Sequence, residues 1–222
     1  NIEYWQAPII GIKKAAEELA KFGVTIDYHF FDYNTTSFNN AASKILELDY
    51  EGLLFAPIFY EESISFLIEY KKKNIPIVMI DSNLQEVEGV AYFGQDSYQS
   101  GYLGGKLLSY GIKTESNVLI LKITRNIEST TRTNVFLQRI KGFYSYFKEK
   151  GHLPKFNFTE ISIKYDTENQ LTKDMFAGID CVFVPNSRVH VVAKFIKEND
   201  LKEMRIVGYE LLKQNLEYLN DG

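Results

Sequence analysis

The sequence predicts an α/β protein built from two doubly wound, parallel-sheet lobes that are joined by a hinge. Short β-branched or aromatic runs alternate with helical patterns along the whole chain, which is typical of parallel sheets with right-handed crossovers. The expected strands are too many for one sheet, and residues 86–95 have the pattern of a crossing segment. We therefore place a boundary near Gly94 and expect a first lobe over residues 1–94 and a second over residues 95–222.

The amino-acid composition excludes several classes of protein. The chain has 222 residues, of which 45% are hydrophobic and 24% charged, as in ordinary folded proteins. A net charge of −4 gives no reason to expect that this segment binds a polyanion by itself. The longest apolar stretches are too short to cross a bilayer. Because Cys181 is the only cysteine, the chain can form neither an internal disulfide nor a thiolate metal cage.

The first helix is expected over residues 9–22, where apolar residues recur at the spacing of one helix face. Pro8 suits the first turn of this helix and Gly23 suits its end. Residues 24–30 then alternate as in a strand. A doubly wound sheet normally opens on a strand, whereas this chain opens on a helix and also finishes on one. We therefore expect the fold to be cut at both ends.

Three more elements complete the expected first lobe. Thr36 or Ser37 can cap a second helix, since a hydroxyl oxygen accepts from a free backbone N–H of the first turn. A buried apolar run at residues 53–55 predicts a strand, and a further strand ends directly before Asp81. The helix between these strands, at residues 63–73, ends in a basic turn that suits the helix dipole.

A capping box opens the expected second lobe. Asp96 is followed three residues later by Gln99, and a helix is expected from there to residue 110. Three glycines inside this helix are costly, so we expect it to pack closely against another backbone, either in this chain or across a dimer. These glycines are Gly101, Gly104 and Gly105.

The rest of the chain continues the same alternation of strand and helix. A short extended piece is expected at residues 90–93. Strands are expected at residues 118–121, 158–163, 182–184 and 206–207, and helices at residues 135–150, 171–176, 189–198 and 211–219.

Polar and aromatic side chains follow three of the expected strands. Asp81 ends one strand, Asn186 and Ser187 follow another, and Tyr209 and Glu210 follow a third. Ligands of open α/β sheets bind beyond the carboxyl ends of the strands, so these side chains are expected to hold a small molecule. Structural alternatives remain open, because Asn186 or Ser187 can cap the next helix and Glu210 can be an exposed loop carboxylate.

The chain also carries short motifs in a fixed order, namely Tyr4-Trp5 followed by Gly11 to Ala16, Tyr50 to Phe55, Ile75 to Asp81, Gln95-Asp96 with Gly101, Arg139 to Phe143, Val184 to Ser187, and Val207 to Glu210. Taken together they resemble the two-lobed sugar-binding fold that LacI-type repressor effector domains share with periplasmic ribose-type binding proteins. The resemblance covers essentially the whole chain and is specific for the fold. It does not separate a repressor from a transport protein.

The resemblance implies ligand-binding residues in the first lobe. Tyr4 and Trp5 would form an aromatic wall against the ligand, with packing at a helix start as the alternative for Trp5. Asp81 would accept hydrogen bonds from sugar hydroxyls. Gln95 would serve the hinge rather than the ligand. The family would add a first strand before Tyr4, a return of strand and helix to the first lobe and, in a repressor, an amino-terminal helix-turn-helix.

Further ligand-binding residues are implied in the second lobe. Arg139 would donate to ligand oxygens, with Arg125 and Arg132 as competing candidates. Asn186 and Glu210 would complete the contacts, and Glu210 is one methylene longer than the Asp usual at this position. Sugars offer hydroxyls and an apolar face, which carboxylates, amides, guanidinium groups and aromatic rings satisfy.

The sequence offers no enzyme signature that competes with binding. We find no acid–base pair or nucleophile elbow, and expect no catalytic residues and no cofactor. His29, His152 and His190 share no metal spacing, so no metal site is expected.

The leading functional hypothesis is the effector-binding domain of a cytoplasmic LacI-type regulator. It would bind a sugar or related small molecule between its lobes, form a homodimer and reach operator DNA only through a helix-turn-helix outside this sequence. The alternatives are an exported, periplasmic sugar-binding protein for transport or chemosensing, and the sensor domain of a membrane kinase. The identity of the ligand stays open.

Overall fold

The computed structural model shows an α/β chain in which every strand pair of the described residues is parallel, which confirms the predicted fold class. The described residues divide into two compact units, residues 1–49 and residues 50–222, and the second unit contains both sheets. The lobe boundary near Gly94 stays a prediction. The structure describes all residues except 1, 85, 89, 111, 114, 125–130, 152–154, 165–169, 202–203 and 222.

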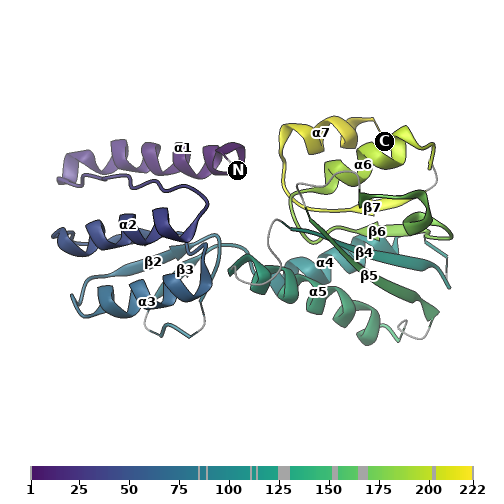
Figure 1. Cartoon of the computed structure of the whole chain (residues 1–222), viewed down its shortest axis with the longest axis horizontal. Coiled ribbons are helices and arrows are strands. Elements are labelled where there is room, and N and C mark those ends of the chain that lie inside the picture. Colours follow the sequence, from purple (N-terminus) through teal and green to yellow (C-terminus); the bar gives the residue numbers. More distant parts are fainter. Residues whose placement is uncertain are drawn as a thin grey trace. The chain divides into compact units, whose positions relative to one another are not determined.

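The first unit is helical. It consists of α1 (Ile2–Leu19), the 3₁₀ helix η1 (Ala20–Phe22) and α2 (Thr35–Glu47) (Figure 1). The predicted start of the first helix is wrong, because α1 begins at Ile2 and Pro8 lies inside it rather than in its first turn. Proline removes one backbone hydrogen bond of a helix. The turns on either side of Pro8 keep theirs, so the helix continues through it.

The predicted strand at residues 24–30 is wrong. The segment joins no sheet of the described residues, although it keeps the alternation that suggested a strand. The rings of Tyr28 and Phe30 stack with their centroids 6.4 Å apart, as side chains two residues apart do on an extended backbone. A strand also needs a neighbouring strand for its N–H and C=O groups, and sequence alternation does not supply one.

The three-stranded sheet opens the second unit. Its order is β1-β2-β3, and α3 lies beside it (Figure 1). The Phe55 ring of β1 contacts the Phe66 ring of α3, with centroids 5.1 Å apart. These elements are β1 (Leu53–Phe55), α3 (Tyr60–Lys71), β2 (Ile77–Ile80) and β3 (Ala91–Phe93).

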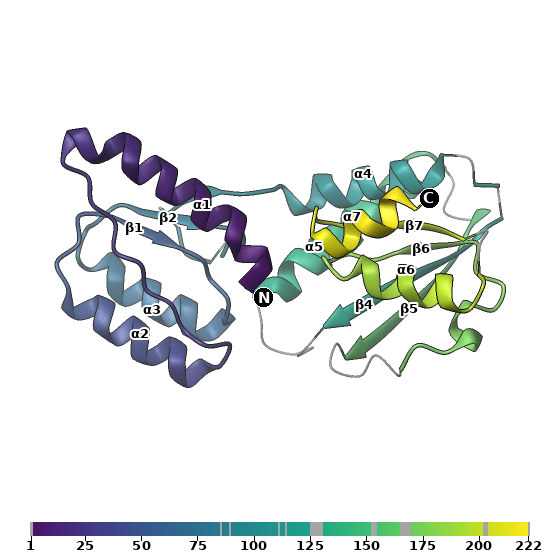
Figure 2. The ribbon, with the colours of Figure 1, turned by 90° about the horizontal axis from the view of Figure 1, so that it is seen from above.

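The four-stranded sheet has the order β5-β4-β6-β7, with helices on both of its faces (Figures 1 and 2). Helices α4 and α5 cover one face, and α6 and α7 lie over the other, so this sheet is doubly wound. Its elements are α4 (Ser97–Ser109), β4 (Asn117–Thr124), α5 (Thr131–Glu149), β5 (Asn157–Lys164), β6 (Cys181–Phe183), α6 (Val189–Glu198), β7 (Arg205–Val207) and α7 (Lys213–Asn220).

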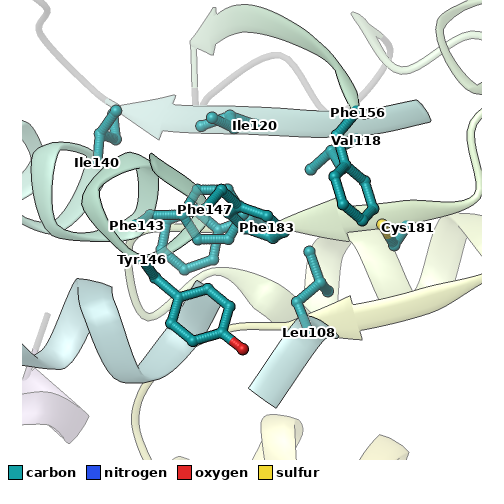
Figure 3. Packing of buried hydrophobic residues seen from close by; sticks show 10 residues of the cluster. All are labelled: Leu108, Val118, Ile120, Ile140, Phe143, Tyr146, Phe147, Phe156, Cys181 and Phe183. Carbon is teal, nitrogen blue, oxygen red and sulfur yellow. The ribbon is translucent and has the colours of Figure 1, made fainter. Parts of the chain in front are cut away.

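The central strand of this sheet, β4, is buried on both faces. Val118 and Ile120 pack against Phe143 of α5 in one core cluster (Figure 3). The alternate residues Leu119 and Leu121 belong to a second cluster on the opposite face. A continuous apolar run is typical of a parallel strand covered on both sides. Packing against both clusters restrains β4, and with it the residues at its carboxyl end.

Glycines let α4 and α5 approach each other closely, as predicted. A Cβ on Gly101 would lie 1.9 Å from the carbonyl oxygen of Arg139, and a Cβ on Gly142 would lie 1.9 Å from that of Tyr98. Each glycine therefore faces the backbone of the other helix. The contact is within this chain, and it sets Arg139 at the edge of the sheet.

Helix boundaries agree with the predictions in most of the second unit. Asp96 caps α4 as expected, its side chain accepting from the Gln99 backbone N–H at 2.9 Å. The predicted helix at residues 171–176 is instead a 3₁₀ turn, η4 (Lys173–Phe176). In the first unit, Asn34 caps α2, so the cap predicted at Thr36 or Ser37 is wrong. Among the described residues, none of the helices has both the length and the hydropathy that a bilayer crossing requires.

Candidate functional site

Polar groups from four segments meet around Arg139 at the carboxyl end of the four-stranded sheet. The Arg139 side chain extends from α5 and is only 9% exposed. Its Nη1 donates to the Pro185 carbonyl at 3.0 Å, and its Nη2 donates to Gln95 Oε1 at 2.9 Å. The guanidinium lies over the Tyr209 ring, 3.9 Å from the centroid. Burial, hydrogen bonds and stacking together hold this cation in one orientation.

The guanidinium keeps unused hydrogen-bonding capacity. An arginine has five N–H donors, and the Nε of Arg139 is buried without a partner among the described residues. Glu210 Oε1 lies 3.9 Å from Nη2, which is an ion-pair distance and too long for a hydrogen bond. A buried cation with open donors is costly unless an acceptor binds there, so the arrangement suits a ligand oxygen.

Two carboxylates that follow strand ends adopt left-handed backbone conformations. Asp81, directly after β2, has φ +68°, and Glu210, after β7, has φ +76°. A residue other than glycine in this region costs about 1–2 kcal/mol, and such strain is concentrated at functional sites. Glu210 is half-buried beside Arg139. The contact with Arg139 argues against a plain exposed loop carboxylate.

Asn186 is buried and serves the protein's own backbone. Its Nδ2 donates to the Ile123 carbonyl at the end of β4, and its Oδ1 accepts from the Arg188 N–H at 3.0 Å. Asn186 does not cap the next helix, which was its predicted structural alternative. The N–H that it binds belongs to Arg188, the residue before α6, and the His190 N–H in the first turn of α6 is bound by Asn215 instead. One amide hydrogen remains for another acceptor. Its role in ligand binding stays a prediction.

A tyrosine joins Asp81 to the crossing segment. The Tyr92 hydroxyl lies 3.2 Å from the Asp81 carbonyl and 3.1 Å from the Gln95 carbonyl, so it can donate to either. Burial and the charge of Asp81 raise the pKa of Tyr92, which keeps this hydroxyl protonated. Because the Gln95 side chain binds Arg139, contacts run from Asp81 to Arg139 through Tyr92 and Gln95.

The structure brings some of the predicted residues together. Arg139 and Glu210 form an ion pair, and Asn186 is the residue after Pro185, whose carbonyl accepts from Arg139. Tyr4 and Trp5 lie in α1 of the first unit, inside the helix rather than before it. Their rings form an edge-to-face pair with centroids 5.3 Å apart. Of the competing arginines, Arg125 and the side chain of Arg132 lie outside the described residues.

Two groups at this edge were missed by sequence reasoning. The Thr124 hydroxyl is buried without a described partner at the end of β4. Thr124 was missed because the strand was predicted to stop at residue 121, whereas β4 ends at Thr124. A correct strand end would have marked it, since ligands bind beyond the carboxyl ends of parallel strands. Asn215, on α7, is buried and forms several hydrogen bonds to the loops. No spacing in the sequence marks it. Among the described residues, no group of three or more His, Cys, Asp or Glu could hold a metal ion.

Comparisons with known proteins agree with this architecture. The family profile described as periplasmic binding protein domain matches residues 1–222. The crystal structure of a candidate LacI transcriptional regulator from Bacteroides fragilis is similar to this chain, with a TM-score of 0.83, 25% identity and coverage of 99% of this chain and 77% of that one. No curated protein matches the sequence.

Two solved sugar-binding proteins share the fold at lower identity. GanP, a glucose-galactose binding protein from Geobacillus stearothermophilus, has a TM-score of 0.75 and 21% identity over 95% of this chain and 76% of that one. A carbohydrate transporter solute binding protein from Agrobacterium radiobacter, in complex with D-arabinose, has a TM-score of 0.77 and 20% identity over 98% of this chain and 75% of that one.

Proposed function

Because the chain belongs to the periplasmic binding protein domain family, we propose that it is the effector-binding domain of a LacI-type transcriptional regulator and that it binds a sugar or related small molecule. Its proposed ligand-binding residues are Tyr4, Trp5, Asp81, Arg139, Asn186 and Glu210. The observation that carries the proposal is the buried Arg139, which is oriented by protein contacts and keeps open donors beside the Glu210 carboxylate.

This combination of groups suits a polyhydroxylated ligand. A sugar hydroxyl can accept from the guanidinium and donate to a carboxylate at the same time. The proposed site holds two carboxylates, Asp81 and Glu210, and one buried guanidinium. Its net negative charge would repel a phosphate, so the site favours a neutral ligand over a phosphorylated one. In this proposal the aromatic pair of Tyr4 and Trp5 covers the apolar face of the sugar ring.

The regulator assignment is supported by the similarity to the Bacteroides fragilis protein, which is higher in identity and TM-score than that to the two sugar-binding proteins above. A homodimer fits the outer face of α4. Leu103, Leu107 and Tyr110 recur there at helical spacing and are 51%, 49% and 56% exposed. Operator DNA would be contacted by a helix-turn-helix that is not part of residues 1–222, and the regulator would act in the cytoplasm without catalysis.

The second candidate is an exported sugar-binding protein for transport or chemosensing, or the sensor domain of a membrane kinase. The similarity to GanP and to the Agrobacterium protein favours it. The complete gene product distinguishes the candidates. A helix-turn-helix supports the regulator, a secretion signal supports the periplasmic protein, and a membrane-spanning helix supports the kinase sensor.

Ligand binding is tested by thermal unfolding with D-glucose, D-galactose, D-arabinose, D-allose and glucose 6-phosphate. We expect one neutral sugar, at a hundredfold excess over its Kd, to raise the Tm by roughly 5–10 °C. The shift should be lost in Asp81→Ala and kept in the control Asp174→Ala, since Asp174 is an exposed residue of η4. No shift with any sugar contradicts sugar binding, and an equal shift in Asp81→Ala removes Asp81 from the site.

A further inference from the structure

Asn215 is a buried amide whose hydrogen-bonding groups are all used by the protein. It lies in the first turn of α7 and is 8% exposed. Its Oδ1 accepts from the His190 backbone N–H at 3.2 Å and lies 2.8 Å from His190 Nδ1. An amide oxygen can only accept, so Nδ1 carries the proton in this contact.

The other end of the amide binds three carbonyl oxygens. Nδ2 donates to those of Tyr209 and Glu210, both at 2.9 Å, and lies 3.3 Å from that of Ser187. Two hydrogens serve these three acceptors. Asn215 therefore joins α7 to the loop after β6, to the first turn of α6 and to the loop after β7.

These two loops carry the groups of the candidate site. Asn186 precedes Ser187, and Glu210 contributes the carboxylate beside Arg139. The left-handed φ of Glu210 is not favoured by a glutamate itself, so something else must hold it. The Asn215 amide hydrogen-bonds the carbonyl groups of Glu210 and of the residue before it, which fixes the peptide group on the amino side of Glu210 and the orientation of its carbonyl.

We propose that Asn215 is a positioning residue that sets the conformation of the loops after β6 and β7, and with it the placement of the Glu210 carboxylate. It has no amide group left to bind a ligand itself. Its effect on sugar affinity rests on the function proposed above, whereas its effect on the loops does not.

Hydrogen exchange of the ligand-free protein, followed by mass spectrometry, tests the effect on the loops. Asn215→Ala should speed exchange by roughly tenfold in peptides covering residues 186–191 and 207–212, since the hydrogen bonds that restrain them are lost. The β4 peptide, residues 117–124, should not change. The matched control is Asn199→Ala, because the half-buried amide of Asn199 lies at the other end of α6 and, among the described residues, donates only to the Phe195 carbonyl.

Asn215→Asp separates the two ends of the amide. The variant keeps the shape and an oxygen for His190 but loses the donors to the carbonyls of residues 209 and 210. Exchange should therefore rise at residues 207–212 more than at residues 186–191. Unchanged exchange at residues 207–212 in both variants overturns the proposal, and so does an equal rise in the β4 peptide, because that would indicate global destabilisation.

The Tm shift produced by whichever of the four neutral monosaccharides stabilises the wild type completes the test. Asn215→Ala should reduce that Tm shift, whereas Asn199→Ala should leave it unchanged. Faster loop exchange with an undiminished shift shows that the loops do not position the site, which overturns the proposal. If no monosaccharide shifts the wild type, the sugar-binding function fails, and hydrogen exchange still decides whether Asn215 sets the loops.

Discussion

Residues 1–49 and the four-stranded sheet use apolar residues in opposite ways. In the first unit, Phe22 is 73% exposed and Ile10 is 65% exposed, although both belong to helical segments. In β4, four consecutive residues, Val118 to Leu121, have no exposure at all. The first helix shows clear apolar periodicity in sequence, whereas β4 is a continuous apolar run. Periodicity reports which residues can share a face, and only burial makes that face contribute to stability.

The two regions also differ in how well local patterns predicted them. In the first unit, the start of α1, the strand at residues 24–30 and the cap of α2 were predicted wrongly. In the sheet of β4 to β7, the strands and α6 were placed within a few residues. Packing on both faces restricts the conformations that a buried element can adopt. The conformation of a segment with little burial depends on local preferences, which are weaker than packing.

The largest difference between the regions is expected on truncating a phenylalanine. Phe183 is fully buried and stacks on Phe143, with centroids 4.2 Å apart. Phe183→Ala should lower the free energy of unfolding by about 3–5 kcal/mol, through lost burial and the cavity left behind. Phe22→Ala, in the exposed η1, should change it by less than about 0.5 kcal/mol. Urea unfolding followed by circular dichroism measures both values, and similar costs would contradict the contrast.

Adding one methyl group should have opposite signs in the two regions. In Gly101→Ala the new Cβ meets the Arg139 carbonyl and forces α4 and α5 apart, which should destabilise the protein by about 1–3 kcal/mol. In Gly11→Ala, nothing lies within 4 Å of the new Cβ. The helix then gains about 0.5–1 kcal/mol from the better propensity of alanine. Paired denaturation curves check both, and a stabilising Gly101→Ala would disprove the close contact.

The smallest effect is expected from acid. Partial burial would raise the pKa of Glu160, but hydrogen bonds from Lys122 Nζ and the Tyr144 hydroxyl outweigh it and hold that pKa below its usual value. A lowered folded-state pKa adds stability that is present above the unfolded value and lost as the pH falls through the folded one. The group is partly exposed, so the contribution should be below about 1 kcal/mol.

Glu160→Gln is the variant that isolates this contribution. The difference in unfolding free energy between wild type and variant should be largest near neutral pH and should shrink as the pH falls below about 4.5, the usual value for a glutamate. Chemical denaturation at several pH values measures it. If the difference in unfolding free energy does not change as the pH falls below about 4.5, the Glu160 charge makes no contribution to stability.

Part of the candidate site could be predicted from the rule that ligands bind beyond the carboxyl ends of parallel strands. The rule led to Asp81, Asn186 and Glu210 because each follows a recognisable apolar run. It could not show that the Asn186 amide is used by the backbone, or that Asp81 and Glu210 have positive φ. Those features depend on partners in other elements, and a local pattern carries no information about them.

The amino-acid sequence by itself determined the α/β class and the order of most strands and helices in residues 50–222, because periodicity and capping act over a few neighbouring residues. Only the tertiary structure decided how the polar groups at the strand ends are used. Tyr209 donates to the Ser100 carbonyl from 109 residues away, and Asn215 holds two loops that no motif connects. A buried hydrogen bond depends on which groups meet after folding, so its partners emerge only when the helices and sheets have packed.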